Sequence, residues 1–293
     1  MTPPRQSSTD TPAAASDSFV EPELNEVQRA AVEALRTDGI AVVKFQDLFG
    51  EELWRDAVAD IEPFIRETEE ATRDAGDRPA GKEELIIRRF FDKAGTKDDG
   101  ENGGKPRFSL RDPWLRIAAS ERMLDIVNSY GGRLTRLFYV DNWFTVPYPG
   151  AGERVASQRW HRDPEDEHVV KVFVYFTDVD EGAGPFEYVR GSSTGGRYGD
   201  LWPWGKGDRY PPTEELEEAV PPEDRLTLTG PAGTIIFCDT GGFHRGGFAR
   251  TKPRVLSIST YLRPDAKKRK PRFKVDLAGL ERTLAPQVRA ALG

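Results

Sequence analysis

The chain has 293 residues, 37% of them hydrophobic and 10% aromatic, which is enough apolar material for a sizeable core. Its 42 Lys and Arg residues against 49 Asp and Glu residues give a net charge of -7, which argues against a protein that binds nucleic acid through its phosphates. The single cysteine, Cys238, excludes intrachain disulfides and multi-cysteine metal sites, and no apolar run approaches the ~20 residues that cross a bilayer. We therefore expect a cytoplasmic protein that acts on a small molecule and binds neither nucleic acid nor membrane. The sequence does not indicate its oligomeric state.

The composition changes along the chain and indicates one domain with a tail. Residues 1–20 are rich in Pro, Ser, Thr and Ala and contain almost no large apolar side chains, so they are expected to be disordered. Residues 21–293 are expected to form a single domain. Within it we expect a helix-rich part over 21–132, a β core over 133–264 and a C-terminal extension over 265–293.

The first part of this domain shows helical spacing of its apolar residues. The spacing predicts helices over 24–35 and 53–65, and the apolar run between them predicts a buried strand over 40–43. Residues 94–107 are crowded with Gly, Lys, Asp, Asn and Glu and are expected to be a mobile loop, either a solvated connector or a lid over a site. An Asp-Pro pair at 112–113 predicts the start of a third helical region.

Beyond residue 132 the pattern changes to short segments of β-branched and aromatic residues separated by turn residues. Helices first and strands second predict a mainly β protein in which a helical layer covers an antiparallel core. The insert 192–224 interrupts the strands, and its aromatic residues are expected to cover a pocket or to serve as a lid. The predicted strands are 137–146, 157–163, 169–177, 185–189, 226–229, 234–239 and 254–262.

Three residues of the β region form a candidate metal site. His161 and Asp163 are two positions apart, so in a strand both side chains lie on one face. His244 lies among glycines, which let the backbone turn and approach other groups closely. Two histidines and one carboxylate are the facial ligand set of non-haem Fe(II) oxygenases, and some zinc hydrolases use a similar set. The residues alone therefore leave both metals open.

An arginine begins the last predicted strand. Arg254 opens an apolar segment, where burial of its charge is unfavourable unless an anion such as a carboxylate binds it. An oxygenase with an anionic co-substrate explains both this arginine and the ligand set. Two alternatives remain. One is a redox-silent, cupin-like isomerase or hydrolase that uses zinc or manganese on the same barrel, and the other is a binding module without turnover.

Several segments resemble the phytanoyl-CoA dioxygenase family of Fe(II)- and 2-oxoglutarate-dependent oxygenases. They are residues 160–163, 178–186 with 191–193, and 233–237 before the distal histidine. The resemblance implies a mainly β fold with a double-stranded β-helix core, which is jelly-roll or cupin-like. It also implies that the three residues of the candidate metal site bind Fe(II), that Arg254 binds the distal carboxylate of 2-oxoglutarate, and that O2 is the co-substrate.

The resemblance also indicates the type of reaction. Asp163 is the carboxylate that halogenating relatives replace with a small residue, so its presence favours oxygenation, with hydroxylation as the default outcome. Desaturation, ring closure or epoxidation can follow the same abstraction of a hydrogen atom. The Arg-, Asp-, Ala- and Gly-rich composition resembles that of high-GC bacterial proteins, among which natural-product tailoring is a frequent role. The substrate itself stays unidentified.

One position departs from the family pattern. Many relatives carry a hydroxyl residue two positions after the distal histidine, where this chain has Gly246. Gln158, three residues before the first ligand, and Asn142, on the apolar side of its strand, are candidates for the missing contact to 2-oxoglutarate. Alternation along a strand disfavours Gln158 unless a bulge intervenes.

Four further residues are candidates for contacts with the substrate. Arg159 shares the strand face of His161 and could point inward. Lys171 interrupts an apolar strand, so it either reaches an anionic group of the substrate or extends to solvent. Trp202 and Trp204 lie in the insert, where their rings are expected to stack on a polar or cationic compound.

Overall fold

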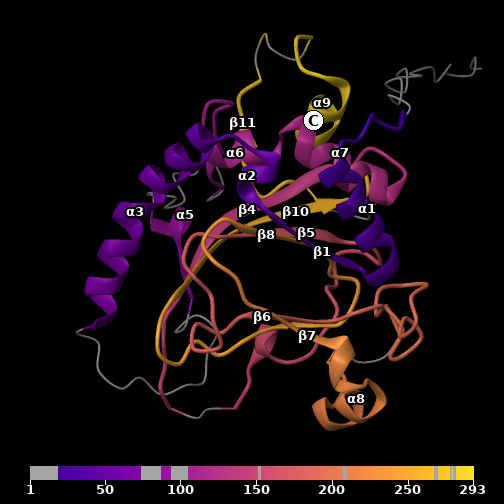
Figure 1. The fold of residues 1–293 in the computed structure, drawn as a ribbon. Helices are drawn as coiled ribbons and strands as arrows, with labels where there is room; N and C mark the ends of the chain where they lie inside the picture. Colours follow the sequence, from indigo (N-terminus) through magenta and orange to yellow (C-terminus); the bar gives the residue numbers. More distant parts are fainter. Residues whose placement is uncertain are drawn as a thin grey trace, which may run out of the picture.

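Two antiparallel sheets face each other in the computed structural model (Figure 1). Residues 19–73, 87–93, 105–150, 153–206, 210–266, 270–277, 279 and 282–293 are described. The larger sheet has the strand order β1-β8-β5-β10-β4-β2, and the smaller has the order β7-β6-β9. The strands of the larger sheet are β1 (Ile40–Lys44), β2 (Ile87–Arg89), β4 (Arg136–Thr145), β5 (Val170–Tyr175), β8 (Thr234–Asp239) and β10 (Arg254–Leu262). Those of the smaller sheet are β6 (Phe186–Val189), β7 (Arg225–Leu228) and β9 (His244–Gly246).

Helices lie mainly on the outer side of the larger sheet, whereas α8 lies beside the smaller one (Figure 1). A short parallel pair, β3 (Arg107–Phe108) with β11 (Lys274–Val275), joins the C-terminal extension to the helical part. The helices are α1 (Glu26–Asp38), α2 (Phe45–Leu48), α3 (Glu51–Arg73), α5 (Phe90–Lys93), α6 (Pro113–Ala118), α7 (Glu121–Gly131), α8 (Thr213–Ala219) and α9 (Pro286–Leu292). Two single 3-10 turns are η1 (Ala156–Gln158) and η2 (Pro222–Asp224).

Local sequence signals set the boundaries of the first helix. The Asn25 side chain accepts a hydrogen bond from the backbone of Gln28, and the Gln28 side chain returns one, which is a capping box. The helix ends at Gly39, whose φ of 77° lies in the left-handed region that glycine adopts without strain. The chain therefore turns directly into β1, which pairs with β8.

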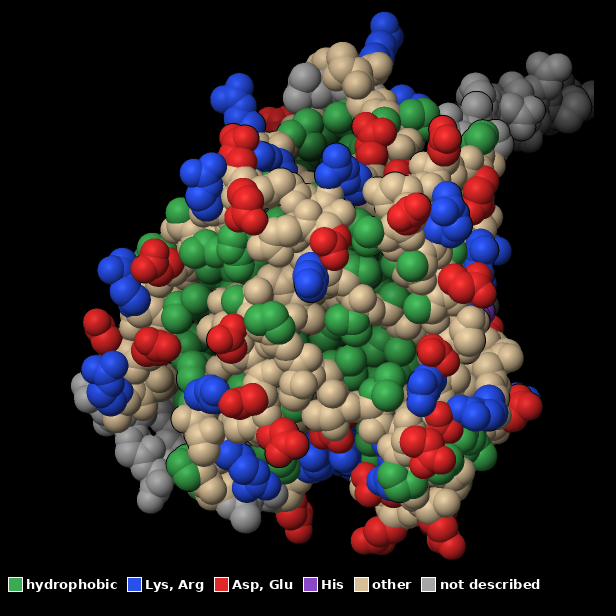
Figure 2. Space-filling model, viewed as in Figure 1, with side chains coloured by type: hydrophobic (Ala, Val, Ile, Leu, Met, Phe, Trp, Pro, Cys, Tyr) green, Lys and Arg blue, Asp and Glu red, His purple; other side chains and the backbone are tan. Residues whose placement is uncertain are grey.

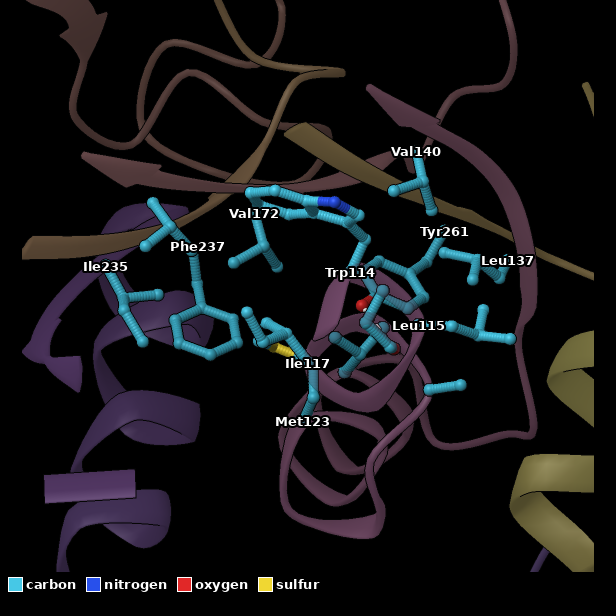
Figure 3. Close-up of a cluster of buried hydrophobic side chains, with 14 of the residues drawn as sticks. Trp114, Leu115, Ile117, Met123, Leu137, Val140, Val172, Ile235, Phe237 and Tyr261 are labelled. Atoms are coloured by element: carbon cyan, nitrogen blue, oxygen red, sulfur yellow. Dashed lines mark hydrogen bonds between the residues drawn. The ribbon is translucent and has the colours of Figure 1, made fainter. Parts of the chain in front are cut away.

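The main hydrophobic core lies between the helical layer and the outer face of the larger sheet. Figure 3 shows Trp114 and Leu115 of α6 and Met123 of α7 facing side chains of the sheet such as Val172 and Phe237. All five are at most 3% exposed. Fully burying a side chain of this kind contributes about 1.5–3 kcal/mol, so this layer fixes the sheet on which the functional residues lie.

A second apolar cluster fills the space between the two sheets. Phe173 of β5 and Leu256 of β10 point inward from the larger sheet, and Phe186 of β6 meets them from the smaller sheet. The ring centroids of Phe173 and Phe186 are 4.7 Å apart. Successive residues of a strand point to opposite faces, and this interior is faced by alternate residues of β4 and β10: Tyr139, Trp143 and Thr145, and Arg254, Leu256 and Ile258.

The surface carries interspersed charges of both signs, as Figure 2 shows for one face. Among the described residues, none of the helices is long and apolar enough to cross a membrane.

The structure confirms the predicted fold class, a mainly β protein with a helical layer and two antiparallel sheets in a jelly-roll arrangement. The strand predicted over 157–163 is wrong. That segment contains η1, followed by extended chain that contributes only an isolated bridge. The tail over 1–20 that was expected to be disordered and the expected loop over 94–107 lie largely outside the described residues. The insert 192–224 contains α8 and η2.

Candidate metal centre

The structure brings His161, Asp163 and His244 together between the two sheets. Each offers one ligand atom, and the three atoms lie within 4.8 Å of one another. His161 and His244 form an antiparallel bridge with both N···O distances at 3.0 Å, and the Asp163 amide donates to the carbonyl of Thr240. The exposed fraction of each of the three residues is at most 6%. The backbone therefore holds the three side chains in place without help from a ligand.

Backbone carbonyls orient both imidazole rings. The Nδ1 of His161 lies 2.8 Å from the carbonyl oxygen of Arg159, and the Nδ1 of His244 lies 3.0 Å from that of Gly242. A proton on each Nδ1 would satisfy these carbonyls and leave Nε2 unprotonated. The two ring centroids are 4.2 Å apart. The arrangement therefore places two imidazole rings beside one carboxylate.

Glycines are required where the chain turns before His244. A Cβ at Gly241 would lie 2.1 Å from the carbonyl oxygen of Glu167, and one at Gly242 would lie 2.4 Å from the Tyr188 hydroxyl. Both distances are far shorter than any normal contact, so a side chain at either position would displace the turn. This is the close backbone approach that the glycine-rich sequence predicts.

Lys171 supplies the positive charge next to the carboxylate. Its Nζ lies 2.7 Å from Oδ2 of Asp163, and the same oxygen lies 3.8 Å from Nε2 of His244. Burial opposes ionisation of Asp163, but its interactions with Lys171, His244 and His161 outweigh burial and hold the pKa of Asp163 below its usual range. Burial, together with His161, lowers the pKa of His244 to about 3, so its imidazole stays neutral.

Arg162 points away from the metal site and ties the surrounding loops together. It is 2% exposed, and its guanidinium lies over the Phe243 ring at 3.8 Å from the centroid. Burial lowers its pKa to about 10, which still leaves it charged at neutral pH. Its charge is balanced by backbone dipoles of the insert and of the glycine turn. The acceptors are the carbonyl oxygens of Ser192, Tyr198, Gly199, Leu201, Trp202 and Gly241.

Arg254 is a buried cation at one end of the same cavity. It is 7% exposed, its Nη1 donates to the carbonyl of Gly184, and its Nε has no hydrogen-bond partner. Among the described residues, no carboxylate forms an ion pair with it. Burial lowers its pKa, because the surroundings do not compensate the charge. A bound anionic ligand would compensate the charge of Arg254.

The cavity itself lies between the two sheets and combines charged and metal-binding groups with apolar walls. His161, His244, Lys171 and Arg254 supply its charged and metal-binding groups. The remaining lining residues are Ile87, Trp143, Thr145, Ser157, Gln158, Phe173, Phe186, Gly246, Gly247, Leu256 and Ile258.

The structure treats the two candidates for the missing 2-oxoglutarate contact differently. Gln158 is 5% exposed and lines the cavity, because η1 interrupts the strand alternation that disfavours it. The prediction that Asn142 contacts 2-oxoglutarate is wrong. It shares the strand face of Phe144, which packs on Phe64 of α3, so it points toward the helical layer and away from the cavity.

The four candidates for substrate contacts also differ in position. Lys171 lines the cavity but pairs with Asp163 instead of reaching solvent. Arg159 does not point inward: it is exposed and lies over the ring of Tyr210, because the chain has only just left η1. Trp202 packs against Phe243, with ring centroids 6.2 Å apart, and does not line the cavity.

Trp204 touches the candidate metal centre from outside the cavity. Its indole Nε1 donates to the backbone carbonyl of Asp163 at 2.8 Å. Tyr210 of the same insert stacks on His161, with ring centroids 5.7 Å apart. The insert therefore contacts two of the three candidate ligand residues.

The sequence analysis missed two residues of this region. Thr145 lines the cavity beside Arg254, and Arg162 organises the loops. Tyr210 is one of the insert's aromatic residues that were expected to cover a pocket, and its ring lies near that of His161. The register of β4 was the available signal for Thr145, because it shares the strand face of Trp143. The positions of Arg162 and Tyr210 depend on the path of the insert, which no local pattern shows.

Solved structures share this fold. AviO1 from Streptomyces viridochromogenes Tue57 is similar with a TM-score of 0.54 and 16% identity, over 85% of this chain and 100% of AviO1. The non-heme α-ketoglutarate-dependent carbocyclase SnoK from nogalamycin biosynthesis is similar with a TM-score of 0.50 and 16% identity, over 88% and 90% of the two chains. EctD from S. alaskensis, solved with bound Fe, has a TM-score of 0.50 and 15% identity, over 86% and 83%.

Sequence comparison gives the family. No curated protein matches the chain by sequence. The sequence model of the phytanoyl-CoA dioxygenase (PhyH) family matches residues 23–254, which is most of the chain and includes every candidate ligand residue. The chain therefore belongs to the phytanoyl-CoA dioxygenase (PhyH) family.

Proposed function

We propose that this protein is an Fe(II)- and 2-oxoglutarate-dependent dioxygenase that oxidises a small molecule, by default through hydroxylation, in the cytoplasm. The observation that carries the proposal is that His161 and His244, whose ligand atoms lie close to that of Asp163, line the same cavity as the unpaired cation Arg254. Membership of the PhyH family supports the same reaction class.

The donor set fits the proposed metal. Two imidazole nitrogens and one carboxylate oxygen bind one face of an octahedral ion and leave the other positions open for a chelating co-substrate and O2. The Nδ1 atoms of His161 and His244 lie beside backbone carbonyls, so the Nε2 atoms are the ones that would bind the metal. Asp163 is held as a carboxylate beside Lys171. Metal binding needs an ionised carboxylate and unprotonated ring nitrogens.

The cavity also fits the proposed co-substrate. Arg254 lacks a carboxylate partner and has a buried Nε without a hydrogen bond, so a carboxylate at this end would satisfy both its charge and its donor. Gln158 lines the same cavity and can donate through its amide. Bound iron with 2-oxoglutarate and O2 would supply the oxidant that removes a hydrogen atom from the substrate.

Secondary metabolism is the setting that we propose for this reaction. SnoK is named a carbocyclase of nogalamycin biosynthesis, and its fold is shared. Ring closure and hydroxylation both begin with removal of a hydrogen atom, so the cavity is compatible with either outcome. Of the four predicted substrate contacts, Lys171 lines the cavity, whereas Arg159, Trp202 and Trp204 lie outside it.

The test is an anaerobic titration of the metal-free protein with Fe(II) and then 2-oxoglutarate, followed by the weak visible charge-transfer band of the chelate. We expect a band in the wild type, none in His161→Ala, and a band that requires much more 2-oxoglutarate in Arg254→Ala. His168→Ala is the matched control, because it removes the histidine that lies outside the cavity.

Two results separate the proposal from its alternative. Formation of succinate from 2-oxoglutarate under air would support the oxygenase. Metal binding without any band or succinate would contradict the proposal and favour a redox-silent metal enzyme on the same barrel.

A further inference from the structure

An arginine of the edge strand β2 lies next to the cavity. Arg89 is the last residue of β2 and the register partner of Trp143 on β4, as Ile87 is of Thr145. Ile87 and Trp143 both line the cavity, and alternate residues of a strand share a face, so Arg89 lies on the cavity side of the sheet. Its guanidinium carbon lies 5.0 Å from the centroid of the Trp143 ring. Arg89 therefore covers one wall of the cavity without being part of its lining.

Three side chains of β4 hold the guanidinium in place. Nη1 of Arg89 donates to the Tyr139 hydroxyl at 2.8 Å and lies 3.6 Å from Oδ2 of Asp141. Tyr139, Asp141 and Trp143 alternate along β4, so all three lie on the same face as the arginine. The cation–π contact and the hydrogen bond together fix the plane of the guanidinium.

The carboxylate of Asp141 does not account for this arginine. Asp141 accepts hydrogen bonds from the Tyr139 hydroxyl, from the indole Nε1 of Trp143 at 3.1 Å and from the amide of Asn142 at 2.8 Å. Arg89, at 3.6 Å, is beyond hydrogen-bond distance. Burial raises the pKa of Asp141, and Arg89 opposes this rise less than each of the three hydrogen bonds does. Asp141 is therefore satisfied mainly by its own strand.

The other edge of the guanidinium carries open donors. Within the part of the chain that the structure describes, Nε and Nη2 of Arg89 form no hydrogen bond or ion pair, and the side chain is 40% exposed. These two nitrogens are the parallel pair of donors that binds an oxyanion bidentately. Arg89 is thus held at Nη1 and open at Nε and Nη2. A single arginine beside a carboxylate suits one negative charge better than the two of a phosphate group.

We propose that Arg89 binds a carboxylate of the substrate, whose apolar body lies along Trp143 and the apolar walls of the cavity. This inference rests on the proposed function and names the substrate class of the same site. Neighbouring strands are about 4.8 Å apart, so β2 lies about 14 Å across the sheet from β5, which carries Lys171 beside Asp163. The carboxylate therefore lies away from the carbon that is oxidised and orients an elongated molecule.

The experiment measures binding of phenylbutyrate and of its neutral isostere phenylbutyramide by calorimetry. Ni(II) and 2-oxoglutarate are present at saturation, so that Arg254 is occupied. We expect wild type to bind the carboxylate about 10- to 100-fold more tightly than the amide, the range for hydrogen bonds to a charged group. Arg89→Met keeps an unbranched side chain against Trp143 and should bind the two probes equally. Arg89→Lys keeps the charge without the fork and should recover part of the preference.

Arg88→Met is the matched control. Arg88 is the neighbouring residue of β2 and points to the opposite face of the strand, so its substitution should leave the affinity for both probes unchanged. A loss of affinity for the amide as well as the carboxylate in Arg89→Met would assign the arginine a structural role and overturn the proposal.

Three other results would overturn it. One is no measurable binding of phenylbutyrate to wild type, and another is a preference for phenylbutyrate that Arg89→Met retains. The third is tighter binding of phenylbutylamine that Asp141→Asn abolishes, because Asp141 would then recognise a cation. All of these measurements use Ni(II) without turnover, so each can fail while the charge-transfer band and succinate formation persist. Absence of that band in the Fe(II) protein would instead overturn the proposed function.

Discussion

In the metal-free protein, the ion pair between Lys171 and Asp163 offsets the unfavourable burial of the Asp163 carboxylate. Both side chains are largely buried, with exposed fractions of 21% and 7%, and their charged atoms are 2.7 Å apart. A buried carboxylate without a partner is strongly unfavourable, whereas a bound divalent metal compensates it. The lysine therefore carries out in the metal-free protein the charge compensation that a metal supplies when bound.

Lys171→Met should destabilise the metal-free protein more than the metal-bound one. We expect a loss of about 3 kcal/mol in the free energy of unfolding without metal, since one member of a buried pair is removed. Addition of Ni(II), a redox-inert divalent ion, should recover most of it. Urea unfolding with and without Ni(II) measures both values.

The control for this prediction is Lys105→Met. Lys105 donates to the carbonyl of Pro271 and has no role beside the triad, so its substitution should give a small loss that Ni(II) does not change. If Lys171→Met lost the same free energy with and without metal, charge compensation at Asp163 would not be the role of the lysine.

His168 gives the fold a pH dependence that is separate from the metal centre. Its Nδ1 lies 3.1 Å from Oδ2 of Asp239, which also accepts from the Tyr130 hydroxyl. The hydrogen bond to Asp239 raises the pKa of His168 against the opposing effect of burial, and Glu167 adds to the rise while Arg263 reduces it. The protonated imidazole is thus favoured in the folded state.

Stability should fall as the pH rises through the pKa of folded His168. A raised pKa in the folded state contributes stability that is complete below the unfolded value of about 6.5 and is lost as the imidazole deprotonates. The difference in unfolding free energy between wild type and His168→Gln should therefore shrink from about pH 6 to pH 8. Urea titrations at steps of pH check this, and a constant difference would contradict it.

At the scale of elements, one side chain joins three segments. Arg162 lies between two candidate ligands in the chain but donates to the insert and to the glycine turn that leads to β9. Arg162→Met would leave several buried carbonyls without a donor. We expect a loss of about 3–5 kcal/mol in the free energy of unfolding, measured in urea.

The matched control is Arg190→Met. Arg190 is partly exposed and bonds with Asp224 and the Glu223 carbonyl on the outer side of the insert, so it should cost about 1 kcal/mol or less. Equal losses for the two variants would show that Arg162 is no more important than a surface contact.

Elements with a local signal were predictable from the sequence, and those held by tertiary pairing were not. Most strands of the larger sheet were expected within a few residues, because their β-branched runs are bounded by turn residues. β9 has only three residues and depends on its pairing with β6. The strand expected over 157–163 failed because η1 and an isolated bridge replace it.

In the candidate site, the residue types were recognisable in the sequence, but the positions of some side chains were not. His161 and His244 stood out because the chain has three histidines, and Asp163 stood out because it lies two positions after one of them. Asn142 was misplaced because β4 is buried on both faces, so hydrophobic alternation does not show which face meets the cavity. The same ambiguity concealed Thr145, although it faces Arg254 across the sheet.

At the scale of the whole molecule, the candidate site contains residues of both sheets. Arg254 and Thr145 belong to the larger sheet, which the helical layer supports, whereas His244 opens β9 of the smaller sheet (Figure 1). A metal with a chelating co-substrate would therefore bind both layers at once. Ligand binding to the folded state alone adds RT ln(1 + [L]/Kd), about 2.7 kcal/mol at a hundred times Kd, to global stability.

Arg254→Met should consequently change stability in opposite directions in the free and the bound protein. Without ligand it replaces a buried cation that has no carboxylate partner by an apolar side chain, which should raise the unfolding free energy by about 1 kcal/mol and the Tm by about 2–4 °C. With Ni(II) present, 2-oxoglutarate should raise the Tm of the wild type but not of this variant. Arg133→Met, at an exposed arginine 48% accessible, is the control and should show the wild-type response. If metal-free Arg254→Met were less stable than wild type, the arginine would stabilise the fold. A variant that is stable but shows no response to 2-oxoglutarate would mean that the arginine is needed for ligand binding and not for stability.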